Sequence, residues 1–149
     1  MADPLLQAEI PLLGLYPEIV GGFSDAVLLD VPLRSCSPLH AELSGHGVTV
    51  CFTARAKTSH TQLVAFHVIQ NDSMLMIPKE AFAGLEDPQF CGFDEGLQLM
   101  LPFCRAARST DGFRTCVHLQ RGEGQRTRLV TWVCDDGRYL FRLKEKVAF

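Results

Sequence analysis

The chain has 149 residues, of which 47% are hydrophobic and 21% are charged, and its formal net charge at pH 7 is −3. A chain of this length predicts a single domain, and a composition this close to that of ordinary globular proteins excludes a disordered or low-complexity chain. The sequence contains no run of about 18 apolar residues, so we expect no helix that spans a membrane.

The start of the chain lacks the features of a secretion signal. It has no basic segment and no sustained apolar stretch ahead of a small-residue cleavage site, so we expect a cytoplasmic or nuclear protein. Disulfide bonds are rare in those compartments. We therefore expect all six cysteines to be reduced: Cys36, Cys51, Cys91, Cys104, Cys116 and Cys134.

The first 25 residues differ from the rest of the chain. Asp3 and Pro4 suit the start of a short helical turn, and Pro11 ends it. The apolar segment that follows is interrupted by Gly14 and Pro17. We expect residues 1–25 to form an N-terminal arm that packs on the domain.

From Ala26 onward, apolar side chains recur at every second position, which is the period of a half-buried β-strand. Asn71-Asp72-Ser73 and Asp135-Asp136-Gly137 are typical turn sequences between such segments. The pattern predicts about eight strands, and nine segments are candidates for them: residues 26–31, 39–44, 48–55, 62–70, 74–77, 97–101, 113–120, 126–134 and 138–143.

One short helix is predicted near residues 78–84, where Pro78 suits the first turn and Gly84 suits the C-terminal end. Residues 86–96 are expected to form an acidic loop and residues 105–112 a polar loop. Sequential strands joined by short turns run antiparallel. The fold class is therefore a mainly β, single-domain antiparallel barrel or sandwich, and the sequence leaves these two open.

Motifs that would assign an enzyme activity are missing. The chain contains no phosphate-binding glycine loop, no G-x-S-x-G and no H-E-x-x-H. Cys116 and His118 would share one face of a strand beside Cys134, but no C-x-x-C pair accompanies them, and zinc sites usually carry such spacing. We predict no catalytic residue, no metal site and no cofactor.

The charges are distributed unevenly along the chain. Residues 1–104 carry twelve acidic and four basic residues, whereas residues 105–149 carry ten basic and five acidic ones. Alternation places several of the arginines on neighbouring predicted strands, where they would form one basic sheet face. The predicted partner-binding arginines are Arg114, Arg126, Arg128, Arg138 and Arg142. The alternatives are pairing with acidic loops of the same domain or simple solvation.

Two phenylalanines in the acidic loop, Phe90 and Phe93, are a second candidate for partner binding, unless they tuck under the loop. Nucleic acid is disfavoured as a partner, because the isoelectric point is about 5.9 and the aromatic residues fall in the inward register. We expect the partner to be an acidic protein segment or an identical subunit.

The sequence thus predicts a non-catalytic protein–protein interaction or assembly module. One alternative is an intracellular β-barrel carrier of a small apolar ligand, which would need an internal cavity. A second alternative is an enzyme whose active site is assembled only in space.

Overall fold

The computed structural model describes residues 28–122, 127–135, 137–143 and 146–147. The predicted arm, residues 1–25, and Arg126 lie outside the described residues. The described elements in chain order are β1 (Leu28–Asp30), β2 (Leu33–Ser37), β3 (His40–Gly45), β4 (Val48–Ala56), β5 (Thr61–Gln70), β6 (Ser73–Met74), the 3₁₀ helix η1 (Lys79–Ala81), β7 (Pro88–Gln89), β8 (Cys91–Asp94), β9 (Leu99–Pro102), β10 (Cys104–Ser109), β11 (Arg114–Arg121), β12 (Arg128–Asp135), β13 (Arg138–Arg142) and β14 (Lys146–Val147).

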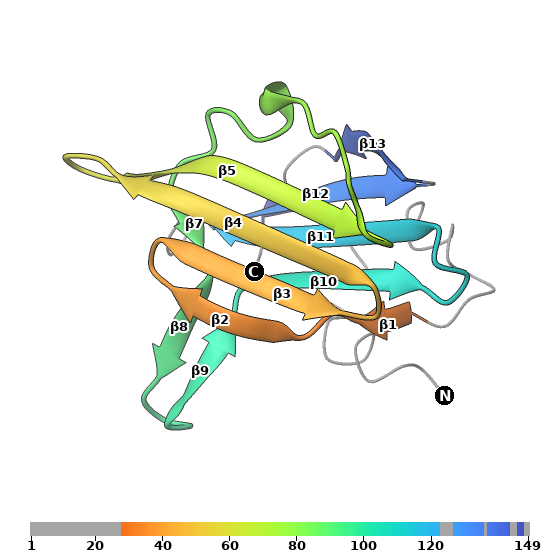
Figure 1. Cartoon of the computed structure of the whole chain (residues 1–149). Coiled ribbons are helices and arrows are strands. Elements are labelled where there is room, and N and C mark those ends of the chain that lie inside the picture. The colour runs from red at the N-terminus through yellow and green to blue at the C-terminus, as the bar shows by residue number, and fades with distance from the viewer. Residues whose placement is uncertain (1–27, 123–126, 136, 144–145, 148–149) are drawn as a thin grey trace.

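These strands form two sheets that face each other and a separate hairpin (Figure 1). The five-stranded sheet has the order β2-β3-β4-β5-β6. The seven-stranded sheet has the order β1-β10-β11-β12-β13, with β7 paired to β11 and β14 paired to β12, while β8 and β9 pair only with each other. Neighbouring strands in each sheet are antiparallel. The sheets do not close into a barrel, so the mainly β prediction is confirmed in its sandwich form.

The space between the two sheets is filled by aromatic side chains. Phe52 of β4 stacks on Phe66 of β5 with their ring centroids 5.0 Å apart, and Phe66 lies 4.4 Å from Trp132 of β12. Phe52, Phe66 and Trp132 are all 2% exposed or less. Close-packed rings of this kind contribute both buried apolar area and pairwise contacts.

The predicted short helix is confirmed in position, but it is a single 3₁₀ turn, η1. Its Ala81 carbonyl accepts a hydrogen bond from the Trp132 indole N–H at 2.8 Å and another from Arg142 Nη1 at 3.2 Å. One carbonyl thus anchors the turn to the seven-stranded sheet. No helix in the described part of the chain has the length and apolar composition needed to cross a membrane.

Two tight turns, one of them predicted at Asn71-Asp72-Ser73, have two consecutive residues with positive φ. His46 and Gly47 join β3 to β4 with φ values of 53° and 78°, and Asn71 and Asp72 join β5 to β6 with φ values of 52° and 67°. Two consecutive positive φ angles characterise the type I′ turn, whose twist matches that of antiparallel strands.

The polar loop predicted over residues 105–112 is wrong, because residues 104–109 form strand β10 in the middle of the seven-stranded sheet. Arg105 and Arg108 interrupt the hydrophobic pattern by which this strand would have been predicted. Ala106 and Ala107, which lie between them, are nevertheless only 1% and 3% exposed. The predicted loop 86–96 likewise contains β7 and β8.

The expectation of six reduced cysteines is also wrong. Cys36 of β2 and Cys91 of β8 form a disulfide bond, whereas Cys51, Cys104, Cys116 and Cys134 are free thiols. The two bonded residues are 55 positions apart, so their proximity depends on the tertiary fold. The cytoplasmic or nuclear location stays a prediction and loses this part of its support.

Candidate interaction surface

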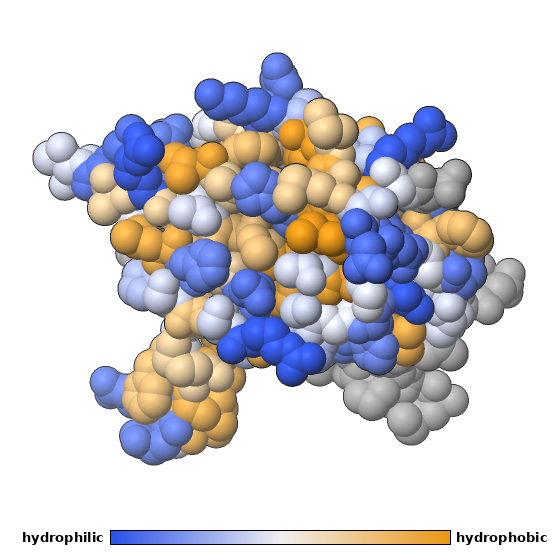
Figure 2. All heavy atoms as spheres, in the orientation of Figure 1, coloured by the Kyte–Doolittle hydropathy of each residue, from blue (hydrophilic) through white to orange (hydrophobic). Residues whose placement is uncertain are grey.

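The β8–β9 hairpin projects from the body of the sandwich. Figure 2 shows it as a largely orange, hydrophobic lobe that extends away from the two sheets. Phe93 is paired directly with Met100, and Asp94 is paired with Leu99. Directly paired residues lie on the same side of a hairpin, so Phe93 and Met100 form one apolar surface.

The apolar side chains of this hairpin are largely open to solvent. The exposed fractions are 56% for Phe93, 62% for Leu97, 45% for Leu99 and 52% for Met100. A two-stranded hairpin is only marginally stable in water unless another layer supports it. Large apolar side chains gathered on such an element, with little cover from the rest of the described structure, are typical of a contact surface for another molecule.

The loop at the tip of the hairpin is held by local hydrogen bonds. The Leu97 backbone N–H donates to Asp94 Oδ1 at 2.9 Å, and Gln98 Nε2 donates to the Glu95 carbonyl oxygen at 2.6 Å. Gln98 adopts a positive φ of 55°. These bonds fix the direction of the tip, so that the apolar surface is presented in a defined shape.

Three contacts hold the base of the hairpin, and one of them, the disulfide, ties it to the five-stranded sheet. The Phe103 N–H donates to the Phe90 carbonyl oxygen at 2.9 Å, and the Cys36–Cys91 disulfide joins β8 to β2. Gly92 lies so close to the Phe103 ring that an added Cβ would be 2.7 Å from ring atom Cε2. Glycine at position 92 therefore allows the Phe103 ring to pack against the hairpin.

The two predicted partner-binding phenylalanines, Phe90 and Phe93, lie in different environments in the structure. Phe90 is 2% exposed and stacks 5.6 Å from Phe52 in the core, so it follows the stated alternative of a ring tucked inside and offers no surface to a partner. Phe93, three residues later, is 56% exposed. The strand that starts at Cys91 carries the chain out of the core between these two positions.

The predicted arginines do not share one sheet face. Arg142 is paired directly with Trp132 of the core, and Arg128 lies on the same face of β12 as Trp132 because four positions separate them. Arg114 and Arg138 are both paired with Asp135, on the opposite face. The predicted outward direction therefore holds for Arg114 and Arg138 but is wrong for Arg142, because the register shift between Val133 and Cys134 turns Arg142 to the inner face.

Of the two outward-facing arginines, Arg114 and Arg138, one is paired with an acidic residue of the same chain. Arg114 Nη2 lies 3.3 Å from Asp135 Oδ2, and no ion pair of Arg138 is found among the described residues. On the inner side, Arg142 donates to the Ala81 carbonyl and Arg128 Nη1 donates to the Thr127 carbonyl at 3.1 Å. The four described arginines therefore do not form one continuous basic surface.

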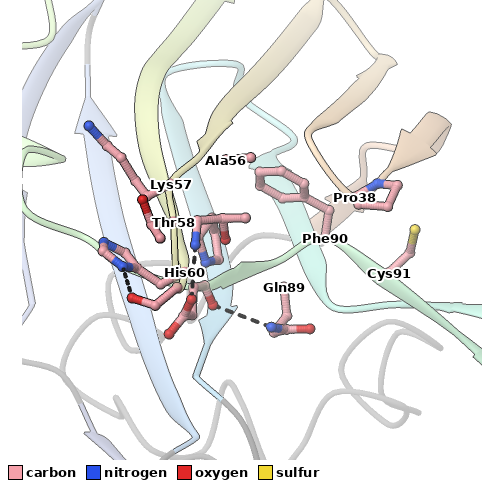
Figure 3. Close-up of a pocket in the computed structure, with 12 residues that line it drawn as sticks. Pro38, Ala56, Lys57, Thr58, His60, Gln89, Phe90 and Cys91 are labelled. Carbon is pink, nitrogen blue, oxygen red and sulfur yellow. Dashed lines mark hydrogen bonds between the residues drawn. The ribbon is translucent and has the colours of Figure 1, made fainter.

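A pocket of about 580 Å³ opens beside the base of the hairpin. Figure 3 shows Pro38 and Phe90 on one side of it and Lys57 and His60 on the other. The Asp87 carboxylate, also in the lining, accepts the Thr61 backbone N–H at 3.2 Å. A lining with this many polar and charged groups does not suit an apolar ligand.

One histidine near this pocket lies between a hydroxyl and a carboxylate. Ser59 Oγ is 3.3 Å from His60 Nδ1, and His60 Nε2 is 3.8 Å from Glu86 Oε2. The side chains of His60 and Glu86 are 32% and 56% exposed. Catalytic trios are held by contacts of about 2.6–3.2 Å with the third group orienting the base. This exposed and loosely spaced arrangement gives no support to an enzyme.

The possible metal ligands do not converge. Cys116 and His118 lie on the face of β11 that is turned away from the five-stranded sheet, whereas Cys134 belongs to the core between the sheets. No group of three or more metal-ligating side chains occurs within the described ranges. Burial raises the pKa of the Cys116 and Cys134 thiols to about 12, so both remain protonated and unreactive at neutral pH.

Comparisons with known proteins give no family: the chain matches no protein-family model, no curated protein and no solved structure. Sequence reasoning identified Phe93 and missed Leu97, Leu99 and Met100, because alternating leucines are also typical of a buried strand.

Proposed function

We propose that this chain is a non-catalytic protein-binding module whose main contact is the β8–β9 hairpin. The observation that carries this proposal is the set of four large apolar side chains, each 45% to 62% exposed, on one projecting element. Burying such side chains in a partner contributes roughly 25 cal/mol for each Å² of apolar surface. Aromatic side chains are common anchors of protein interfaces, and we assign this role to Phe93.

The charge of the hairpin favours a protein partner over a lipid surface. Residues 88–103 contain no Lys or Arg, and Asp94 and Glu95 lie beside the apolar side chains. Interfacial membrane segments usually combine apolar residues with basic ones that attract anionic lipids. An apolar groove with a basic rim would complement the hairpin in both shape and charge.

The predicted basic face contributes less to this proposal than the hairpin does. Its residues are divided between two faces, and Arg114 is already paired with Asp135. We retain Arg138 as a peripheral contact for an acidic segment of the partner. Exposed charges of this kind change association rates more than affinity.

The two alternative functions receive less support. An apolar carrier needs an apolar internal cavity, but the interior is occupied by stacked rings and the pocket of about 580 Å³ has a polar lining. An enzyme needs oriented titratable groups, and the Ser59–His60–Glu86 group is exposed and widely spaced.

Affinity capture with three versions of the protein tests the proposal. The versions are the wild type, the double variant Phe93→Asp/Met100→Asp, and the control Phe113→Asp. Phe113 is the matched control because it is also a phenylalanine with 56% exposure and lies outside the hairpin. We expect a set of captured proteins that is lost only with the hairpin variant. Equal capture by all three versions would contradict the proposal.

Two further measurements separate the possible occupants of the hairpin. Self-association that depends on Phe93, measured by light scattering over a range of concentrations, would identify a second copy of the chain as the partner. Co-sedimentation with phosphatidylserine vesicles that is lost in the double variant would identify a lipid surface and contradict the proposal of a protein partner.

A further inference from the structure

The outer face of the seven-stranded sheet is the side that is turned away from the five-stranded sheet. Val117 and Trp132 are directly paired and belong to the core, so the residues next to them in each strand project outward. The register places two rows of residues across β10, β11 and β12 on this outer face: Ala107, Cys116 and Val133, and Arg105, His118 and Thr131.

Most of this outer face is shielded from solvent. The exposed fractions are 3% for Ala107, 4% for Cys116, 2% for Val133, 4% for His118, 0% for Thr131 and 1% for Leu129. None of these six residues belongs to the core cluster between the sheets. A sheet that is buried on both faces needs a layer on each side.

The described elements do not supply that second layer. Apart from β8 and β9, each described strand belongs to one of the two facing sheets. The turn η1 is bonded to Trp132 on the inner side, and the hairpin is tied to β2 of the five-stranded sheet. No strand or helix of the described residues therefore covers this face.

We propose that residues 1–27 of this chain dock on the outer face of the seven-stranded sheet. The other segments outside the described residues have at most four residues each. Residues 1–27 lead directly into β1, an edge strand of this sheet, where Leu28 is paired with Ser109 and is 3% exposed. The docking segment therefore starts beside the face that it covers.

The composition of the segment fits that face. It is rich in large apolar residues: Leu5, Leu6, Ile10, Leu12, Leu13, Leu15, Tyr16, Ile19, Val20 and Phe23. It also contains four acidic residues and no Lys or Arg, whereas the face carries Arg105. The apolar side chains of the segment complement the apolar outer face, and its acidic residues complement the charge of Arg105.

The reactivity of two cysteines in the full chain can report whether the outer face is covered. Cys116 and Cys134 lie on adjacent strands, are 4% and 0% exposed, and have pKa values raised to about 12 by burial. They lie on opposite faces of the same sheet: Cys116 under the proposed cover and Cys134 in the core between the sheets. The ratio of their alkylation rates therefore reports on one face alone.

The experiment compares iodoacetamide labelling of Cys116 and Cys134 by peptide mass spectrometry under native conditions. The test variant is Leu12→Asp/Leu13→Asp/Leu15→Asp, and the control variant places the same number of charges on the hairpin, as Leu97→Asp/Leu99→Asp/Met100→Asp. We expect the Cys116/Cys134 ratio to rise by about tenfold in the test variant, because local opening exposes only the outer face. The control variant should leave the ratio unchanged.

Three results would overturn the inference. An unchanged ratio in the test variant would show that another part of the molecule covers the face. An equal rise at both cysteines would show that the segment supports the whole fold and not this face. A Cys116 protection that falls on dilution of the wild type would assign the cover to a second copy of the chain. The outcome is independent of what the hairpin binds.

Discussion

The Cys36–Cys91 disulfide ties the base of the projecting hairpin to β2 of the five-stranded sheet. Phe90, the residue before Cys91, is held in the core. The chain therefore leaves the core through a covalently fixed point, and an element whose apolar side chains face solvent is held in place. The hairpin gains from this tether the support that its own two strands do not provide.

The disulfide predicts the number of titratable thiols. In denaturant without reductant, thiol titration should count four cysteines, corresponding to the four free ones, and reductant should raise the count to six. A count of six without reductant would contradict the bond.

Removing the disulfide should lower the stability of the fold. The bond joins positions that are 55 residues apart, and closing a loop of this kind typically stabilises a protein by about 2–4 kcal/mol. We expect Cys36→Ser/Cys91→Ser to lose stability in this range, measured by urea unfolding under non-reducing conditions. The control Cys51→Ser, at a free thiol, should lose much less. Equal effects in both variants would show that the tether adds nothing.

The aromatic core predicts a large difference between two identical substitutions. Phe52 is 0% exposed and stacks with Phe66 and Phe90, whereas Phe113 is 56% exposed. Phe52→Ala should cost about 3–5 kcal/mol through lost burial and a cavity, while Phe113→Ala should change stability by about 0.5 kcal/mol or less. Similar costs at both positions, measured by urea unfolding, would contradict the described core.

His118 makes the fold sensitive to acid. Burial, and then the nearby positive charge of Arg105, lower its pKa from 6.5 to about 4. Its Nδ1 lies 2.8 Å from Thr131 Oγ1, and its Nε2 has no hydrogen-bond partner among the described residues. Because the unfolded chain takes up this proton more readily, stability is fully present above about pH 6.5 and falls as the pH drops toward 4.

The measurement is urea unfolding of the wild type and of His118→Leu at pH 7.5 and pH 4.5. We expect the wild type to lose up to about 3 kcal/mol more than the variant between these values. Loss of the same size in both proteins would assign the acid sensitivity to other groups. The carboxylates titrate in both proteins, so their contribution cancels in the comparison.

Strand β4 could be predicted because only one of its faces is fully buried. In β4, Val48, Val50 and Phe52 are buried and alternate with less buried residues, and this period is visible in the sequence. Strand β10 has both faces covered and contains two arginines, so it shows no period. Alternation of apolar and polar residues predicts a strand only where buried and exposed positions alternate. In a strand that is covered on both faces, this alternation is absent and the prediction fails.

The candidate site was predictable only in part for a related reason. Phe90 and Phe93 are the same residue type in the same short segment of the sequence, yet Phe90 is in the core and Phe93 is on the hairpin. Arg114 and Arg138 point outward as predicted, but the irregularity between Val133 and Cys134, which no local pattern announces, turns Arg142 to the inner face. The Cys36–Cys91 pairing depends on tertiary proximity, which no local pattern encodes.

Site-specific photo-cross-linking tests the role of the hairpin most directly. A benzophenone amino acid replaces Phe93 in one protein and Phe113 in a control, two aromatic positions with the same 56% exposure, and both proteins are irradiated in cells that express them. The account predicts a discrete cross-linked protein adduct from position 93 that Met100→Asp abolishes, and no such adduct from position 113. Adducts of equal yield from both positions, or none from position 93, would contradict the assignment of the hairpin as the binding element.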